Sequence, residues 1–132
     1  MDDQRGSLRV LSERLLRLHR LLLDRQRVAY EARHGAVVAR DLFNLLLSDE
    51  AFAWLRPLSQ MVARIDELVD AKGPVAEADA RRLLQEAHAL LKSDAHHAFH
   101  DKYRDALQDS ADVVMAHAEV SKLFKPPERA NG

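Results

Sequence analysis

Apolar residues recur through most of the chain at spacings of three, four and seven, the period of a helix with one buried face. The first such stretch runs from about Leu8 to His34, with Ser7 as a possible N-cap and Gly35 as the residue that ends it. Its stripe consists of Leu8, Leu11, Leu15, Leu18, Leu22 and Ala29, widened by Leu16, Leu23 and Tyr30. So broad an arc is typical of a bundle helix rather than of a coiled-coil seam. Leu21 lies off the arc, and we expect it to be exposed.

A second, shorter apolar segment spans residues 37–47, and we expect a helix of two or three turns that begins near Ala39. Ser48 and Asp49 follow it and offer an N-cap for the next helix. That next helix is predicted over residues 50–71, where acidic side chains at its start suit the positive helix end.

The helix over residues 50–71 has the cleanest apolar stripe and holds the only tryptophan, Trp54, and a proline, Pro57. Its stripe is Leu55, Leu58, Val62, Ile65 and Val69. Since proline lacks an amide hydrogen, we expect a kink near Ala53 or Trp54. The stripe stays in phase through the proline, which predicts one bent helix rather than two. We expect the other helices to pack around this stretch, Phe52 to Asp70.

The clearest break in the pattern is Lys72-Gly73-Pro74, where a glycine precedes a proline that cannot continue a helix. Three more helices are predicted after it, over residues 77–92, 96–108 and 111–124. Ser110 is the expected cap of the last one. The apolar phase also runs straight through Asp109 and Ser110, so a single helix over 96–124 remains the alternative.

The pattern therefore predicts an all-α fold, an antiparallel helical bundle of four main helices plus one or two short helices. No alternating run indicates a strand. The 132 residues suit a single helical-bundle domain, 1–132, with a buried core, and a content of 5% aromatic residues favours helices over strands. We expect residues 1–7 and 125–132 to be disordered tails.

Charge is unevenly distributed along the chain. Residues 1–40 carry nine Lys or Arg against five Asp or Glu, and residues 41–132 carry eleven against sixteen. A nucleic-acid-binding helix would gather its basic residues on one face, but here arginines flank both sides of the apolar arc. They also alternate with acids one turn away, in the pairs Glu13–Arg17, Arg20–Asp24 and Arg27–Glu31. We therefore expect a solvated outer face and no nucleic-acid partner.

Several kinds of chemistry have no matching residues. The chain has no cysteine, which excludes disulfides, thiolate catalysis and Cys-ligated zinc. Its glycines are isolated, and no Gly-x-Ser-x-Gly elbow occurs. The first residues lack a secretory signal, and no apolar run is long enough to span a bilayer. We expect a cytoplasmic protein with no membrane partner, no cofactor and no enzymatic activity.

Histidine is over-represented, with seven residues, and three of them are close together: His96, His97 and His100. Histidines one helical turn apart can hold one divalent metal ion, so these three are candidate metal ligands. A full site needs a further fixed ligand, and the residues required for hemerythrin-like or ferritin-like sites are missing. Metal is therefore an unlikely partner. His88 and His117 are predicted on or near core faces, where they could meet.

A second candidate region surrounds Trp54, Arg56 and Asp66. Asp66 lies at the edge of an apolar stripe, where we expect a partly buried carboxylate paired with Arg56 or with an arginine of another helix. A structural ion pair is favoured over a catalytic acid, because such networks also place carboxylates in these positions. An interior pocket near Trp54 is the candidate site for a small ligand.

The same stretch resembles a family of small bacterial helical proteins of unknown function. The residues that carry the resemblance are Phe52-x-Trp54-Leu55-Arg56-Pro57-Leu58-Ser59, Arg64-Ile65-Asp66-Glu67, Ala29-Tyr30-Glu31 and Val113-Val114-Met115-Ala116-His117-Ala118-Glu119. The resemblance covers most of the chain and implies a bacterial, soluble, helical protein. It implies no activity, so it assigns no role to any residue.

Two functional hypotheses follow. The first is a non-enzymatic helical bundle that acts through protein–protein contacts, either with a partner or as a homodimer. It predicts that Leu21, Val37, Val38 or neighbouring apolar side chains are exposed in the monomer. The alternative is a bundle that binds a metal through the three clustered histidines, or a small ligand in a pocket near Trp54.

Overall fold

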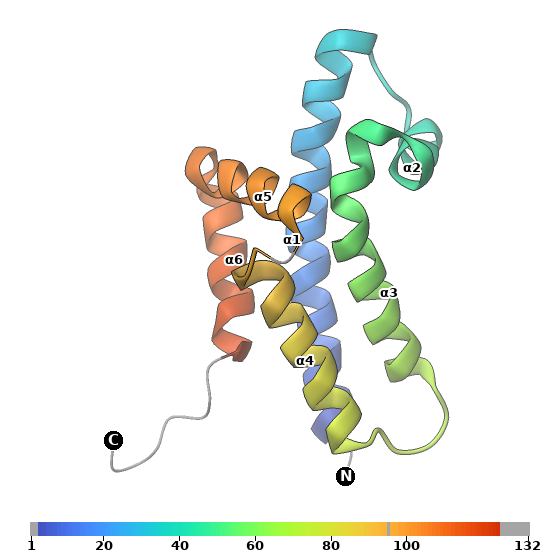
Figure 1. Cartoon of the computed structure of the whole chain (residues 1–132). Helices are drawn as coiled ribbons and strands as arrows, with labels where there is room; N and C mark the ends of the chain where they lie inside the picture. Colours follow the sequence, from blue (N-terminus) through green and yellow to red (C-terminus); the bar gives the residue numbers. More distant parts are fainter. Residues whose placement is uncertain (1–2, 95, 125–132) are drawn as a thin grey trace.

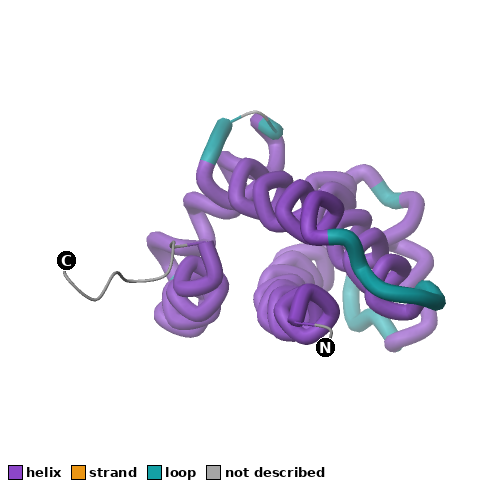
Figure 2. Tube along the Cα trace, turned by 90° about the horizontal axis from the view of Figure 1, so that it is seen from below, coloured by secondary structure: helices purple, strands orange, loops and turns teal. Residues whose placement is uncertain are grey.

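A computed structural model describes residues 3–94 and 96–124 of the chain, all of them in helices or the loops between them (Figures 1 and 2). The helices are α1 (Asp3–His34), α2 (Ala39–Ser48), the 3-10 helix η1 (Glu50–Leu55), α3 (Arg56–Asp70), α4 (Glu77–Lys92), α5 (His97–Asp109) and α6 (Ala111–Phe124). The predicted all-α bundle is confirmed. Among these helices, none is both long and apolar enough to cross a membrane.

The axis of the bundle is α1, which runs its full height in Figure 1. This helix has 32 residues, about 48 Å at 1.5 Å per residue, and it contacts α3, α4, α5, α6 and η1. The predicted stripe is buried over its first half, at Leu8, Leu11, Leu15, Leu18 and Leu22. The stretch Phe52–Asp70, which forms η1 and α3, contacts α1, α2, α4 and α5, so the expectation that the other helices pack around it holds for all of them except α6. Helix α6 packs against α1, α4 and α5 instead.

The start of α1 corrects the prediction of a disordered tail over residues 1–7, because the helix already includes residues 3–7. Arg5 explains why: its guanidinium donates to the carbonyl oxygens of Val69 at 2.9 Å, Ala71 at 2.9 Å and Gly73 at 2.6 Å. These carbonyls end α3 and begin the loop to α4. The predicted tail at 125–132 lies outside the described residues.

The predicted bent α-helix over residues 50–71 is instead η1 followed directly by α3. Asp49 begins η1, its side chain accepting from the amide of Ala51 at 2.8 Å. Pro57 then lies in the first turn of α3, where a helix needs no amide hydrogen from it. The change from 3-10 to α-helix thus accommodates the proline without a broken hydrogen bond inside α3.

The last two helices are separate, which settles the alternative of one long helix. Ser110 has extended dihedral angles, φ −130° and ψ 116°, and its hydroxyl oxygen accepts from the amide of Val113 at 3.2 Å. The chain therefore turns at Ser110. Figure 1 shows α5 (orange) lying across the bundle while α6 (red) runs along it.

Candidate functional site

The described helix with the least tertiary cover is α2, which contains no buried residue. Leu42, Leu45 and Leu46 face the rest of the molecule and are partly buried. On its outer side, Phe43 and Leu47 are each 61% exposed, and they lie one helical turn apart. We call Phe43 and Leu47 the α2 face.

Polar contacts at both ends of α2 add to the partial burial of its leucines and hold the helix against the bundle. Arg56 donates to the carbonyl oxygens of Leu46 at 3.1 Å and Asp49 at 2.8 Å, both at the end of α2. Before the helix, the Glu31 carboxylate accepts from the amide of Val37 at 2.7 Å. Arg56, a candidate pocket residue from the sequence, therefore anchors the end of α2.

Beside α2, the end of α1 extends past its covering helices (Figure 1). The apolar stripe continues to Ala29, one heptad after the buried Leu22, but Ala29 is exposed, as is Val28. Leu21, expected to be exposed, is instead partly buried against the core. The predicted stripe is therefore correct in phase but loses its cover near residue 25, where the neighbouring helices end.

A groove of about 440 Å³ lies between the end of α1, η1 and α5, and we call it the Trp54 groove. It is lined by Arg25, Gln26, Val28, Ala29, Trp54, Lys102 and Asp105. The indole nitrogen of Trp54 donates to the Gln26 side-chain oxygen at 2.8 Å, and the ring packs against Phe99 with centroids 6.0 Å apart. The expected hollow near Trp54 is therefore present, but Arg56 and Asp66 do not line it.

Four charged side chains near this end have no side-chain partner among the described residues. Within residues 3–94 and 96–124, neither Arg40 nor Asp41 of α2 forms an ion pair or hydrogen bond through its side chain, and the same holds for Lys102 and Asp105 of the groove. Arg25 does have a partner, since it donates to Asp109 at 2.7 Å. The helix and the groove thus each present one free cation and one free anion.

Asp66 has a different partner from the predicted arginine. The Ser12 hydroxyl of α1 donates to its carboxylate at 2.5 Å, and the Asp66 residue is exposed overall rather than partly buried. The choice of partner depends on the rotation of α1 against α3, which places Ser12 opposite Asp66. No arginine is positioned there.

Two helical turns after Ser12, in the same interface between α1 and α3, His19 is only 8% exposed. The sequence pattern did not predict that His19 is buried. Ser59 donates to the carbonyl oxygen of Leu55 at 3.3 Å, so its oxygen accepts from Nε2–H of His19, 2.6 Å away. Burial lowers the pKa of His19 below its usual range. The spacing of seven between Ser12 and His19 was the available signal, since it puts both on one flank of the stripe.

His88 and His117, which could have met in the bundle, have separate partners. His88 contacts Phe124 edge-on at 5.0 Å, whereas His117 lies between two other groups. Its Nδ1 is 2.5 Å from the buried Tyr103 hydroxyl, and its Nε2 is 3.1 Å from the Lys92 ammonium. Because an ammonium only donates, Nε2 accepts and Nδ1–H donates to Tyr103.

The electrostatics of this cluster follow from its burial. Burial and then the Lys92 charge lower the pKa of His117, and burial raises the pKa of Tyr103. The neutral histidine therefore links α4, α5 and α6. The contacts of His117 with Lys92 and Tyr103 therefore serve to hold these three helices together.

The three candidate metal ligands gain no geometric support. His96 lies just before α5, His97 is its first residue, and both are exposed. Across the described part of the chain, no group of three or more His, Asp or Glu side chains is arranged to hold a metal ion.

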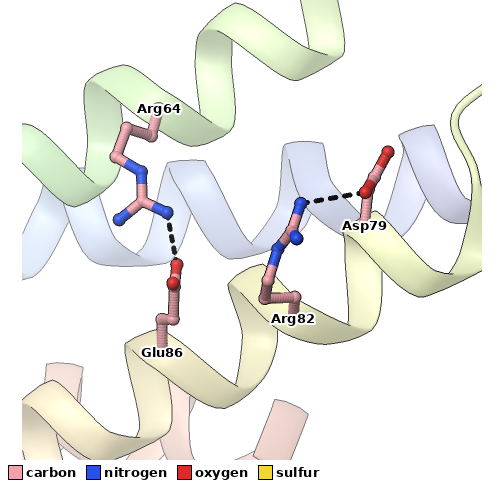
Figure 3. A network of polar contacts seen from close by, with 4 residues as sticks. All are labelled: Arg64, Asp79, Arg82 and Glu86. Carbon is pink, nitrogen blue, oxygen red and sulfur yellow. Dashed lines mark hydrogen bonds and ion pairs between the residues drawn. The ribbon is translucent and has the colours of Figure 1, made fainter.

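A second hollow, of about 320 Å³, lies between α3 and α4. Figure 3 shows the ion pairs beside it: Arg64 with Glu86 at 2.5 Å, and Arg82 with Asp79 at 2.9 Å. Their side chains are substantially exposed, so each pair contributes little to stability. Of the charged side chains that line this hollow, Arg64, Asp79 and Arg82 are paired, whereas Glu67 has no side-chain partner among the described residues.

Comparison of the chain with known protein families, curated proteins and solved structures found no match. The fold and the surface described above define an all-α bundle with one incompletely covered end. The resemblance noted from the sequence stays a prediction.

Proposed function

We propose that this chain is a non-enzymatic helical protein that acts by binding a protein partner through the α2 face. The observation that carries the proposal is that α2 buries none of its residues while Phe43 and Leu47 are each 61% exposed. Val38, one of the residues expected to be exposed, adds a further apolar side chain just before α2 at 60% exposure. Val37, by contrast, is partly buried.

Exposed apolar residues are common, so their arrangement decides the argument. On α6, Val114 and Met115 are exposed, but the opposite face of that helix is buried through Val113, Ala116 and Val120. On α2 the opposite face, formed by Leu42, Leu45 and Leu46, is only partly buried. Apolar side chains one turn apart on a helix are the usual anchors for recognition between a helix and a groove.

The non-enzymatic part of the proposal is supported by the positions of the polar pairs. His19 with Ser59 links α1 to α3, and Tyr103 with His117 links α5 to α6. Neither pair lines the Trp54 groove, which is the roomiest hollow near the α2 end. The groups best placed for proton transfer are thus separated from the place where a substrate would fit.

A photo-crosslinking experiment tests the proposal in cells that make the full chain. The crosslinking residue p-benzoylphenylalanine replaces Phe43 in one version and Met115 in the control, two side chains of nearly equal exposure at 61% and 63%. We expect a protein adduct from position 43 and little from position 115. No adduct at position 43, or equal adducts at both, would contradict the proposal.

A further inference from the structure

We propose that the partner is a second copy of this chain, and that α2 of each copy lies in the Trp54 groove of the other. This inference rests on the proposed function, because it names the occupant of the α2 face. The juxtaposition that carries it is a helix with an exposed apolar outer face and a groove lined by the end of α1, η1 and α5 in the same molecule.

Reciprocal pairing satisfies both features without a third component. The helix of one copy fills the groove of the other, and a twofold axis makes the second contact identical to the first. The assembly then closes at two copies, because no helix and no groove is left over. A one-way contact would leave both free and would extend into a chain of copies.

The apolar groups of the helix and the groove match in kind. Phe43 and Leu47 supply two adjacent side chains, and Val28, Ala29 and Trp54 supply the apolar lining of the groove. Ala29 continues the stripe that is buried lower on α1, and Val28 lies beside it, so an incoming helix would take the place of a covering helix. The dimer thereby completes the cover that α1 lacks in the single chain.

The unpaired charges match as well. Helix α2 presents Arg40 and Asp41, and the groove presents Lys102 and Asp105. None of these four has a side-chain partner in the described structure, so each can pair across the interface. The net charge of −1 per chain adds almost no long-range repulsion between copies.

The size of the contact indicates a weak dimer. A ten-residue helix is about 15 Å long and about 10 Å wide, so seating one face buries roughly 200–250 Å² on each surface. Two such contacts bury on the order of 1,000 Å² in total, near the lower limit for a specific interface. We therefore expect an equilibrium between monomer and dimer that depends on concentration.

Light scattering over a wide range of concentrations tests the dimer with the full chain. The mass should rise from 15.0 kDa toward about 30 kDa and stop there. The variant Phe43→Ser should weaken dimerisation about tenfold or more, whereas Met115→Ser should leave it unchanged. A mass that continues to grow past two copies would overturn the reciprocal arrangement.

A mixing experiment tests the groove separately from the helix. Ala29→Glu places a charge in the groove at an exposed helical position, so the variant should fold but not dimerise. Phe43→Ser keeps an intact groove, and Ala29→Glu keeps an intact α2. Mixed together, the two variants should associate more strongly than either does with itself and more weakly than the wild type, because only their heterodimer has one complete contact. If Ala29→Glu dimerises normally, α2 pairs elsewhere and the inference is wrong.

The only tryptophan supplies an independent signal, because Trp54 lines the groove. Trp54 is already only 8% exposed in the single chain, so its fluorescence should change slightly rather than strongly as the wild-type concentration rises, and Phe43→Ser should remove that change. If the chain stays monomeric while position 43 crosslinks to a different protein, the inference that the partner is a second copy is wrong, but the proposed function stands. If the chain forms no dimer and position 43 gives no crosslink, both the dimer and the proposed function are wrong.

Discussion

The two ends of the bundle contain similar residues but differ in how those residues are partnered. At the end where α3 joins α4, Arg5 donates to three carbonyl oxygens and Val75 is buried within the loop. At the end where α1 finishes, Phe43 is exposed and Arg40 has no partner. The first end is held together by hydrogen bonds and by a buried loop residue, whereas the second exposes a large apolar side chain of the kind found in binding surfaces.

The largest expected effect compares two phenylalanines only nine positions apart. Phe52 is 0% exposed in the core, so Phe52→Ala should lower the free energy of unfolding by about 3–5 kcal/mol. Phe43 is 61% exposed, so Phe43→Ala should change it by no more than about 0.5 kcal/mol. Urea unfolding at a concentration where the chain is monomeric measures both. Similar losses for the two variants would mean that α2 is part of the monomer core.

The next comparison concerns two arginines at opposite ends. Arg5→Ala removes a charged donor from carbonyls that terminate α3, and we expect a loss of about 1–3 kcal/mol. Arg40→Ala removes an unpartnered side chain and should change stability by less than about 0.5 kcal/mol. Thermal unfolding of both variants provides the measurement. An Arg5→Ala protein as stable as wild type would show that α1 is not anchored through this residue.

Acid should destabilise the bundle through the buried His19 and the partly buried His117. The pKa values of His19 and His117 are lowered in the folded chain, so below about pH 6.5 the unfolded chain binds more protons than the folded one. The free energy of unfolding therefore falls as pH decreases, by at most about 1.4 kcal/mol per pH unit for each histidine.

Urea unfolding at several pH values between 7.5 and 5 checks this dependence. His117→Gln should flatten the decline, because the titrating group between Lys92 and Tyr103 is gone. His97→Gln, at an exposed position, is the matched control and should keep the wild-type slope. An unchanged slope in the His117 variant would exclude that residue as a source of the acid sensitivity.

Much of the fold was predictable because helical period and capping are local properties. The bounds of α4 and α6 agree with the prediction, and those of α1 and α5 differ only at their ends. What the sequence could not show is where a stripe loses its cover. Ala29 has the same phase as Leu22, yet only the lengths of the neighbouring helices decide which of them is exposed.

The candidate site was predicted only in part for the same reason. Trp54 does line a groove, but the partner of Asp66 depends on how two helices rotate against each other. The phenylalanine and leucine of the α2 face carried no distinguishing pattern, since α2 is amphipathic whether or not its outer side is covered. Sequence period gives the direction of a side chain, whereas tertiary structure gives its neighbours.

The smallest expected effect concerns the charges around the groove. If Asp41 of one copy pairs with Lys102 of the other, Lys102→Asp should weaken the dimer by about two- to fivefold, the usual size for an exposed ion pair. Adding Asp41→Lys should restore it, because the pair then has reversed signs. Neither change should alter unfolding of the monomer, since neither side chain has a partner there. Light scattering at low salt measures the effect, which should shrink as salt screens the pair. A double variant weaker than either single one would show that these two residues do not meet, and would place a different pair of charges across the interface.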